Sequence, residues 1–187
     1  MNKKPEVTDA TRNTFVVAFC ELYREKPIEK ISVKEVIARA GYSRATFYNY
    51  FQDVYDLREY AENAFIDSIM ARVVENIRSG RQMDDFVLTF MNILQENTFY
   101  IDVFIGSANS SHFVEKIYKR TTPLLRDAFG LSDDNMSAAY VLKFYIAGLI
   151  PTLGMWLQSD RFLTEEDLAL LIKGILRDGI IKQLNSY

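Results

Sequence analysis

The apolar positions of this chain recur with the 3.6-residue period of α-helices along most of its length. In the first helix they form one face, at i, i+4, i+7 and i+8: Phe15, Phe19, Leu22 and Tyr23. Pro27 ends this helix, and Gly80 ends a second long helix that begins near residue 54. The same pattern predicts helices at about 84–96, 98–107, 111–129, 135–158 and 164–184, the last two capped by Asp133 and Thr164. No segment of convincing length alternates with the two-residue period of strands, so we predict an all-α fold.

Residues 31–57 contain two short helices joined by a glycine turn. Ser32 and Glu35 have the spacing of a capping box, Gly41 supplies the left-handed backbone of a tight turn, and Ser43 caps the second helix. Apolar residues of both helices fall on inward faces: Val33, Val36, Ile37 and Ala40, then Phe47, Tyr50 and Phe51. The layout predicts a helix-turn-helix. Residues 1–52 would form a three-helix DNA-binding domain, and residues 53–187 a larger helical domain that the helix starting near residue 54 connects to it.

The outer face of the second short helix carries side chains suited to a DNA major groove. Arg44 can reach guanine or phosphate, Ala45 allows close approach of the backbone, and Asn49 can read a base edge. Thr46 and Tyr48, with the first amides of the helix, can hold phosphates. The predicted DNA contacts are Ser32, Lys34, Ser43, Arg44, Ala45, Thr46, Tyr48, Asn49 and Tyr50. The alternative is an amphipathic helix pair whose polar face is merely solvated.

The same stretch closely resembles the signature of the TetR family of transcriptional regulators. The matching residues are Ile31, Ser32, Val33, Val36, Ile37, Ala40, Gly41, Tyr42, Ser43, Thr46, Phe47, Tyr48, Tyr50 and Phe51, with Tyr42 in place of the usual Val. The resemblance implies an N-terminal reading head and a variable helical domain that dimerises and often binds a small effector. The residues from Phe144 to Leu168 also resemble the C-terminal region of one subgroup.

One departure from the family pattern concerns a phosphate contact. Val54 stands where the family usually has a Lys that holds the DNA backbone, and Leu57 matches the Leu that follows it. Arg58, Lys34 or the tail residues Lys3 and Lys4 are the candidates to compensate. With few cationic contacts, we expect modest affinity and a shallow salt dependence, since each neutralised phosphate contributes about −0.9 to the slope of log K against log salt.

The last two helices are predicted to form a homodimer. The segment 135–158 is apolar nearly all round, Gly148 and Gly154 permit close helix approach, and Pro151 should kink the helix. A prokaryotic helix-turn-helix normally works as a dimer on a palindromic operator, with reading helices about 34 Å apart. A central core helix without a partner is the alternative.

Aromatic residues of the C-terminal two-thirds could line an apolar effector pocket. The candidates are Tyr100, Phe104, Phe113, Tyr118, Phe144, Tyr145 and Trp156, together with Phe99. Aromatics at this spacing also occur as ordinary core, which is the alternative for each of them.

Composition narrows the function classes. Residues 1–60 carry ten Lys and Arg against nine Asp and Glu, while the whole chain has a net charge of −3, which permits a nucleic-acid-binding end. A single cysteine, Cys20, fits a reducing cytoplasm and a core position, and His112 is expected to be solvated. The most apolar run, 144–157, is shorter than the roughly 20 residues of a bilayer span. We therefore expect no membrane partner.

Catalytic chemistry is not indicated. The sequence has no His/Cys/Asp cluster for a metal, no Gly-rich phosphate loop and no nucleophile–base pair, so we predict no enzyme, metal or cofactor. The prediction is a cytoplasmic, dimeric repressor controlled by a small-molecule effector. Two alternatives are an activator controlled by a protein co-factor and an all-α adaptor with weak or no DNA binding.

Overall fold

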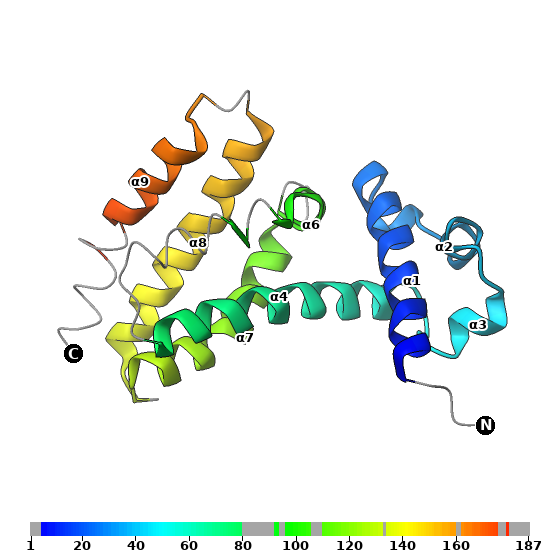
Figure 1. Cartoon of the computed structure of the whole chain (residues 1–187), viewed down its shortest axis with the longest axis horizontal. Helices are drawn as coiled ribbons and strands as arrows, with labels where there is room; N and C mark the ends of the chain where they lie inside the picture. The colour runs from blue at the N-terminus through cyan, green and yellow to red at the C-terminus, as the bar shows by residue number, and fades with distance from the viewer. Residues whose placement is uncertain are drawn as a thin grey trace. The chain divides into compact units, whose positions relative to one another are not determined.

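A computed structural model describes residues 5–79, 92–93, 96–105, 110–132, 134–159, 162–175 and 179 (Figure 1). Regular elements in these ranges are all helical, which confirms the all-α prediction. The chain divides into two compact units, unit 1 (Met1–Phe65) and unit 2 (Ile66–Tyr187), and helix α4 (Val54–Arg78) contributes to both. The predicted domain boundary after residue 52 stays a prediction. Most of the helix predicted at 84–96 lies outside the described residues.

Unit 1 is built on α1 (Pro5–Glu25), the short 3-10 helix η1 (Ile28–Lys30), α2 (Val33–Ala40) and α3 (Arg44–Tyr48). Helix α1 packs on α2, and α2 on α3. Apolar side chains from each helix close the core, where Phe15, Val36, Phe47 and Leu57 are fully buried. The ring of Phe15 meets that of Phe47 edge-on at 5.4 Å between centroids, an arrangement that favours aromatic packing.

The turn between α2 and α3 has the predicted geometry. Ser32 and Glu35 form the capping box: the Glu35 amide donates to Ser32 Oγ at 3.3 Å, and the Ser32 amide to the Glu35 carboxylate at 3.0 Å. Gly41 adopts φ 72°, a left-handed conformation that disfavours a side chain. Ser43 Oγ accepts from the Thr46 amide at 3.1 Å and so starts α3. Of the four α2 residues predicted to face inward, Val36 is buried and the other three are half-buried.

Unit 2 contains α6 (Thr98–Phe104), α7 (Ser110–Phe129), α8 (Met136–Gln158) and α9 (Glu165–Ile175), and both α6 and α7 pack against α8. A Cβ atom on Gly154 would meet Ile105 Cγ2 at 3.0 Å, so this glycine lets α8 approach the end of α6 within the unit. A Cβ on Gly148 would meet open space. The close approach predicted for Gly154 thus serves intramolecular packing.

The predicted caps of the last two helices have different outcomes. Thr164 caps α9, because its hydroxyl accepts from the Asp167 amide at 3.1 Å. Helix α8 is capped by Asn135, whose side chain accepts from the Ala138 amide at 2.9 Å, so the prediction of Asp133 was wrong. Asp133 itself lies outside the described residues. Both Asp and Asn are good caps, and the point where the helical turns begin decides between them.

Helix α8 contains 22 residues, Met136–Leu157, that are long and apolar enough by length and composition to cross a bilayer, with a mean hydropathy of 1.4. This span exceeds the 14-residue run on which the sequence argument rested. Lys143 lies within it and pairs with Glu115 of α7. A buried or dimerising helix of a water-soluble protein has the same length and composition.

The single cysteine and the single histidine lie where the sequence predicted. Cys20 is fully buried in unit 1, and its burial raises the pKa of the thiol, as expected for a core residue. His112 is exposed near the start of α7.

Candidate DNA-binding site

The reading face of unit 1 is the outer side of α3, and packing on its inner side holds it in place. Phe47 is fully buried, with its ring 5.7 Å from the ring of Phe51. Because successive helical residues are 100° apart, anchoring Phe47 inward directs the flanking side chains outward. Four predicted contacts of α3 and its C-cap are exposed: Arg44, Ala45, Tyr48 and Asn49.

Arg44 and Tyr48 form a pair on this face, one helical turn apart. Arg44 Nη2 donates to Tyr48 Oη at 3.3 Å, and the guanidinium lies 5.5 Å from the ring centroid. The contact restricts two long side chains before any partner arrives, which reduces the entropy lost on binding. Tyr48 keeps 48% of its surface exposed.

Three of the predicted hydroxyl contacts also serve the helix caps. Ser43 Oγ lies 2.8 Å from Thr46 Oγ1 and also accepts from the Thr46 amide, and Thr46 is half-buried. Ser32 Oγ donates to the Glu35 carboxylate at 2.8 Å. Ser32 and Lys34 are exposed at the start of α2. Tyr50 is half-buried, with its ring 6.3 Å from Phe15.

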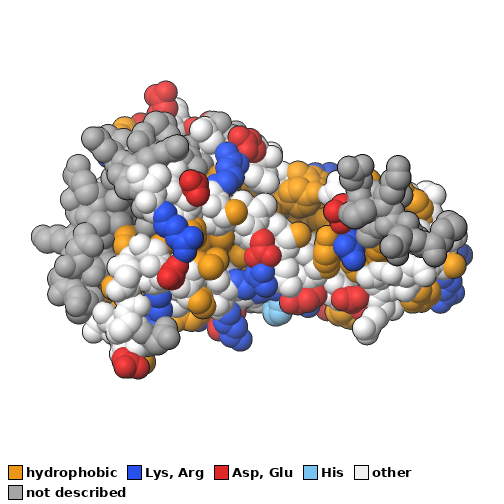
Figure 2. Space-filling model, turned by 60° about the horizontal axis from the view of Figure 1, so that its bottom comes forward, with side chains coloured by type: hydrophobic (Ala, Val, Ile, Leu, Met, Phe, Trp, Pro, Cys, Tyr) orange, Lys and Arg blue, Asp and Glu red, His pale blue; other side chains and the backbone are white. Residues whose placement is uncertain are grey.

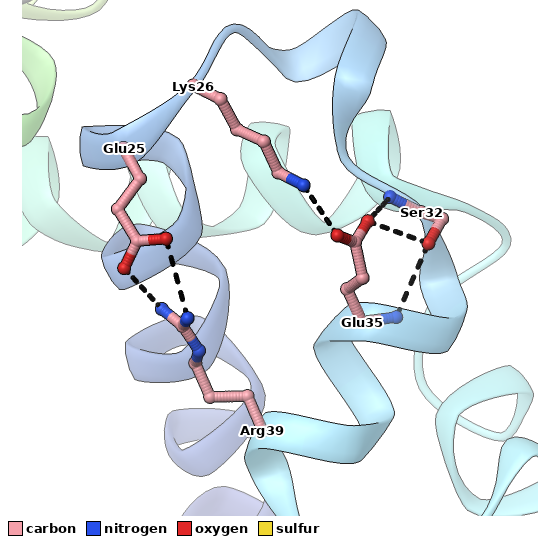
Figure 3. Close-up of polar contacts among 5 residues, drawn as sticks. All are labelled: Glu25, Lys26, Ser32, Glu35 and Arg39. Atoms are coloured by element: carbon pink, nitrogen blue, oxygen red, sulfur yellow. Dashed lines mark hydrogen bonds and ion pairs between the residues drawn. The ribbon is translucent and has the colours of Figure 1, made fainter.

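A polar network ties α1 to α2 (Figure 3). Lys26 Nζ donates to Glu35 Oε1 at 2.5 Å, and the Arg39 guanidinium donates to both carboxylate oxygens of Glu25, at 2.9 and 3.4 Å. The hydrogen bonds from Lys26 and Ser32 lower the pKa of Glu35 to about 2. The Arg39 hydrogen bond likewise lowers the pKa of Glu25. These ion pairs were not predicted from the sequence, because no local pattern indicates which charged side chains of two crossing helices lie close together.

The network reduces the positive charge available to DNA. Lys26 and Arg39 both face carboxylates, whereas Lys30, Lys34 and Arg44 have no carboxylate partner within the described part of the chain. Figure 2 shows Lys and Arg side chains beside Asp and Glu side chains on the face drawn, without a broad patch of one sign.

The start of α4 contains Val54, where the resemblance implies a Lys. Asp53 Oδ1 accepts from the amides of Tyr55 and Asp56, both at 2.8 Å, and Val54 is only 7% exposed. Arg58, one candidate to replace the family Lys, keeps its side chain 20% exposed with Nε 3.7 Å from the buried Glu62 carboxylate. Its Nε is thus directed at a buried carboxylate, while its guanidinium carbon lies 5.8 Å from the ring centroid of Tyr55.

The candidate effector residues do not all come together. Phe104 stacks on Tyr100 and on Phe113, with centroids 6.4 and 5.2 Å apart, so these three form one cluster where α6 meets α7. Phe99 joins the cluster through Tyr100, at 5.3 Å. The structure does not bring Phe144 into it: that side chain is 74% exposed on α8.

The other three candidates have separate contacts. Tyr118 lies under the Lys143 amino group, 4.2 Å from its ring centroid. Tyr145 is half-buried with its ring 5.4 Å from that of Phe144. Trp156 is buried, and its indole N–H donates to the Leu163 carbonyl at 2.9 Å, which ties α8 to the segment before α9.

A second surface stands out on unit 2. The last two helices expose large apolar side chains at helical spacing, a surface we call the α8–α9 face: Met136, Tyr140, Phe144, Met155, Leu170, Leu171 and Ile175. No group of three or more His, Cys, Asp or Glu side chains able to hold a metal occurs among the residues that the structure describes.

Comparison with known proteins gives two matches to protein families. Residues 16–61 match "Bacterial regulatory proteins, tetR family", and residues 81–178 match "Transcriptional regulator C-terminal region". The first match covers the C-terminal part of α1, all of α2 and α3, and the start of α4. The second covers more than half of the chain.

Individual relatives agree with these matches. DhaS of Lactococcus lactis, the "HTH-type dhaKLM operon transcriptional activator", is 30% identical over 105 residues, which are 55% of this chain and 54% of that protein. The "Uncharacterized HTH-type transcriptional regulator YvdT" of Bacillus subtilis is 26% identical over 101 residues, 52% of this chain and 48% of that one. The chain thus spans about half the length of these curated relatives.

Solved structures share the fold. A TetR transcriptional regulator from Streptococcus agalactiae superposes with a TM-score of 0.60 at 20% identity, covering 92% of this chain and 99% of that one. At this level of identity the likeness concerns the fold alone.

Proposed function

The chain belongs to the TetR family of bacterial transcriptional regulators, and from this premise we propose that it is a cytoplasmic, dimeric repressor that binds a palindromic operator. The family consists of regulators and not of enzymes, in agreement with the predicted absence of catalytic chemistry. The observation that carries the proposal is the outer face of α3, where Arg44, Tyr48 and Asn49 are exposed above the buried Phe47.

The chemistry of this face supports DNA as the partner. Arg44 offers a planar guanidinium for guanine or phosphate, Asn49 an amide for a base edge, and Tyr48 a hydroxyl for a phosphate. Ala45 leaves room for the helix to approach the bases. The two further contacts proposed at the start of α2, Ser32 and Lys34, are exposed. Thr46, Ser43 and Tyr50 support the position of α3 as well as offering contacts.

The α8–α9 face supports a second copy of the chain as its occupant. Phe144 and Leu170 are 74% and 66% exposed, although side chains of this kind gain about 1.5–3 kcal/mol each from full burial. Two helices of one copy against the same two of another would form a self-complementary interface of two-fold symmetry. That symmetry matches two reading helices to the successive major grooves of a palindrome.

An apolar small molecule is the proposed effector, and the cluster of Tyr100, Phe104 and Phe113 is the proposed binding region. Stacked aromatic rings provide the apolar walls common to small-molecule sites. The effector would bind more tightly to one relative placement of the two DNA-binding domains of the dimer than to another. Helix α4 would carry the change from the effector site to these domains. A 100-fold change in operator affinity needs about 2.7 kcal/mol of differential binding.

Activation in place of repression is the second candidate. The relative DhaS is named an activator of its operon, and the chain is 30% identical to it over 105 residues. Control by a protein co-factor would suit the activator as well as control by a small ligand. An adaptor with weak DNA binding is the remaining alternative, which the scarcity of unpaired cations favours.

The test is a mobility-shift assay with duplex DNA from the region upstream of the gene. We expect the wild-type protein to shift this DNA, and Tyr48→Ala to weaken the shift at least tenfold, because the outer face loses its largest contact. Leu124→Ala, an exposed position of α7, is the matched control and should bind like wild type. Unchanged binding by Tyr48→Ala and by Thr46→Ala would contradict the proposed reading face. Reporter expression with and without the regulator distinguishes repression from activation.

A further inference from the structure

We propose that Arg12 of α1 is a DNA-phosphate ligand, held in position by the rings of Tyr50 and Tyr60, and that it replaces the cation missing at Val54. The inference rests on the proposed function, since it names a further contact of the same DNA-binding surface. The starting observation is the position of the Arg12 side chain beside two tyrosine rings.

The guanidinium of Arg12 lies close to two tyrosine rings. Its Cζ is 5.7 Å from the ring centroid of Tyr50, directly after α3, and 5.7 Å from that of Tyr60, on α4. Cation–π contact with two rings orders a side chain that is otherwise among the most flexible. Arg12 therefore joins α1 to the chain on either side of the α3–α4 turn.

The arrangement leaves the guanidinium able to bind an anion. The side chain of Arg12 remains 37% exposed, and a cation–π contact does not use up the N–H donors of the guanidinium. Its carboxylate neighbour is Asp9, at 3.5 Å and itself 73% exposed. An exposed pair of this kind contributes little and is screened by salt, so a phosphate can compete with it.

The location fits the missing contact. Val54 begins α4 and is buried, and Arg58 directs its Nε at the buried Glu62 carboxylate. Lys34 lies at the start of α2, so it does not serve the α3–α4 turn. Arg12 lies against Tyr50, the residue after Asn49 of the reading face, and against Tyr60 of α4. A guanidinium there can grip one backbone phosphate with two parallel hydrogen bonds.

The experiment measures binding to duplex DNA from the upstream region and to a random duplex, each at several salt concentrations. For Arg12→Gln we expect affinity to fall about tenfold on both duplexes and the salt slope to fall by about 0.9, because a phosphate contact carries no sequence information. Arg12→Lys should keep the slope and recover part of the affinity. The matched control is Arg24→Gln, which removes the same charge from the last turn of α1, about 18 Å along the helix. It should change the slope less than Arg12→Gln does.

Several outcomes would overturn the proposal. One is an unchanged salt slope in Arg12→Gln. Another is a loss confined to the upstream duplex, which would mean that Arg12 merely positions α3. Should Arg12→Gln fail to fold, modification of wild-type arginines by phenylglyoxal, followed by mass spectrometry, decides the question: DNA should protect Arg12 and leave Arg24 reactive, and equal protection would contradict the contact. If the wild-type protein binds neither duplex, the proposed function itself fails, a result distinct from any of these.

Discussion

The two units expose different kinds of large apolar side chains. Among the residues of unit 1 whose side chains the structure describes, the exposed ones are tyrosines: Tyr42, Tyr48, Tyr55 and Tyr60. In unit 2 most of them have no hydrogen-bonding hydroxyl, among them Phe144, Met155, Leu170 and Ile175. A tyrosine offers an apolar ring and a hydroxyl that remains hydrogen-bonded beside water and phosphate. A leucine or phenylalanine gains free energy chiefly by leaving water. The first surface therefore suits a hydrated, charged partner, and the second a dry protein partner.

The charges follow the same division. In unit 1, Lys26 and Arg39 pair with Glu35 and Glu25, which leaves fewer cations for DNA. In unit 2 the ion pairs join neighbouring helices, for example Arg120 of α7 with Asp67 of α4 and Lys143 of α8 with Glu115 of α7. Exposed pairs such as these contribute at most about 1 kcal/mol each. They influence helix register more than overall stability.

The largest expected effect is the difference in unfolding free energy between a core variant and a surface variant of α3. Phe47→Ala should lower the free energy of unfolding by about 3–5 kcal/mol, because it leaves a cavity among Phe15, Phe51 and the other core residues. Its neighbour Tyr48 is 48% exposed, so Tyr48→Ala should change the same quantity by less than about 0.5 kcal/mol. Urea denaturation followed by circular dichroism measures both. Similar losses for the two variants would show that α3 has no buried side.

The next effect tests the α8–α9 face. Phe144→Asp should convert a dimer into a monomer, since a charge placed at the centre of a dry interface weakens association by about 2 kcal/mol or more. Light scattering across a range of protein concentrations gives the mass, and the mobility shift should weaken in parallel. Leu124→Asp places the same charge on α7, where the side chain is 41% exposed, and is expected to leave the dimer intact. A dimer that persists in Phe144→Asp would place the interface elsewhere.

The smallest effect concerns pH and belongs to unit 1. The pKa of Glu35 is about 2 in the folded protein, below its ordinary value of 4.5, so the ionised carboxylate stabilises the fold fully above pH 4.5. This contribution is lost as the pH falls from about 4.5 toward 2. Wild-type protein should therefore lose more unfolding free energy between pH 5 and pH 3 than Glu35→Gln does, by urea denaturation at each pH. Glu29→Gln, at an exposed position of η1, serves as the control. Equal pH dependence in wild type and Glu35→Gln would refute the contribution.

Local signals were the part of the fold that sequence could predict. The capping box of Ser32 and Glu35, the left-handed Gly41 and the Ser43 cap depend on residues within four positions of one another, and all three occur as predicted. The burial of Phe47 follows from helical period in the same way. Asp133 shows the limit of local reasoning, because Asn135, two residues later, competes for the same cap and the helix begins at the later one.

The candidate sites were predictable to different degrees. The exposed face of α3 follows from the anchoring of one aromatic residue, so Arg44, Tyr48 and Asn49 could be named in advance. The aromatic cluster of unit 2 could not be separated from Phe144 by sequence, because spacing along one helix does not tell which neighbouring helix covers each side. Arg58 was likewise predicted as a possible phosphate contact. The sequence did not indicate that its Nε lies 3.7 Å from the buried carboxylate of Glu62.

By itself, the sequence determined the helical class, the starts and turns of the helix-turn-helix, and the family to which the chain belongs, since each depends on short-range spacing and backbone preference. Only the tertiary structure decided which charges of α1 and α2 neutralise each other, which side of α8 stays uncovered, and that Arg12 lies close to Tyr50 and Tyr60. These contacts join residues far apart in the chain. Their partners are fixed by how helices cross and not by the period within any one helix.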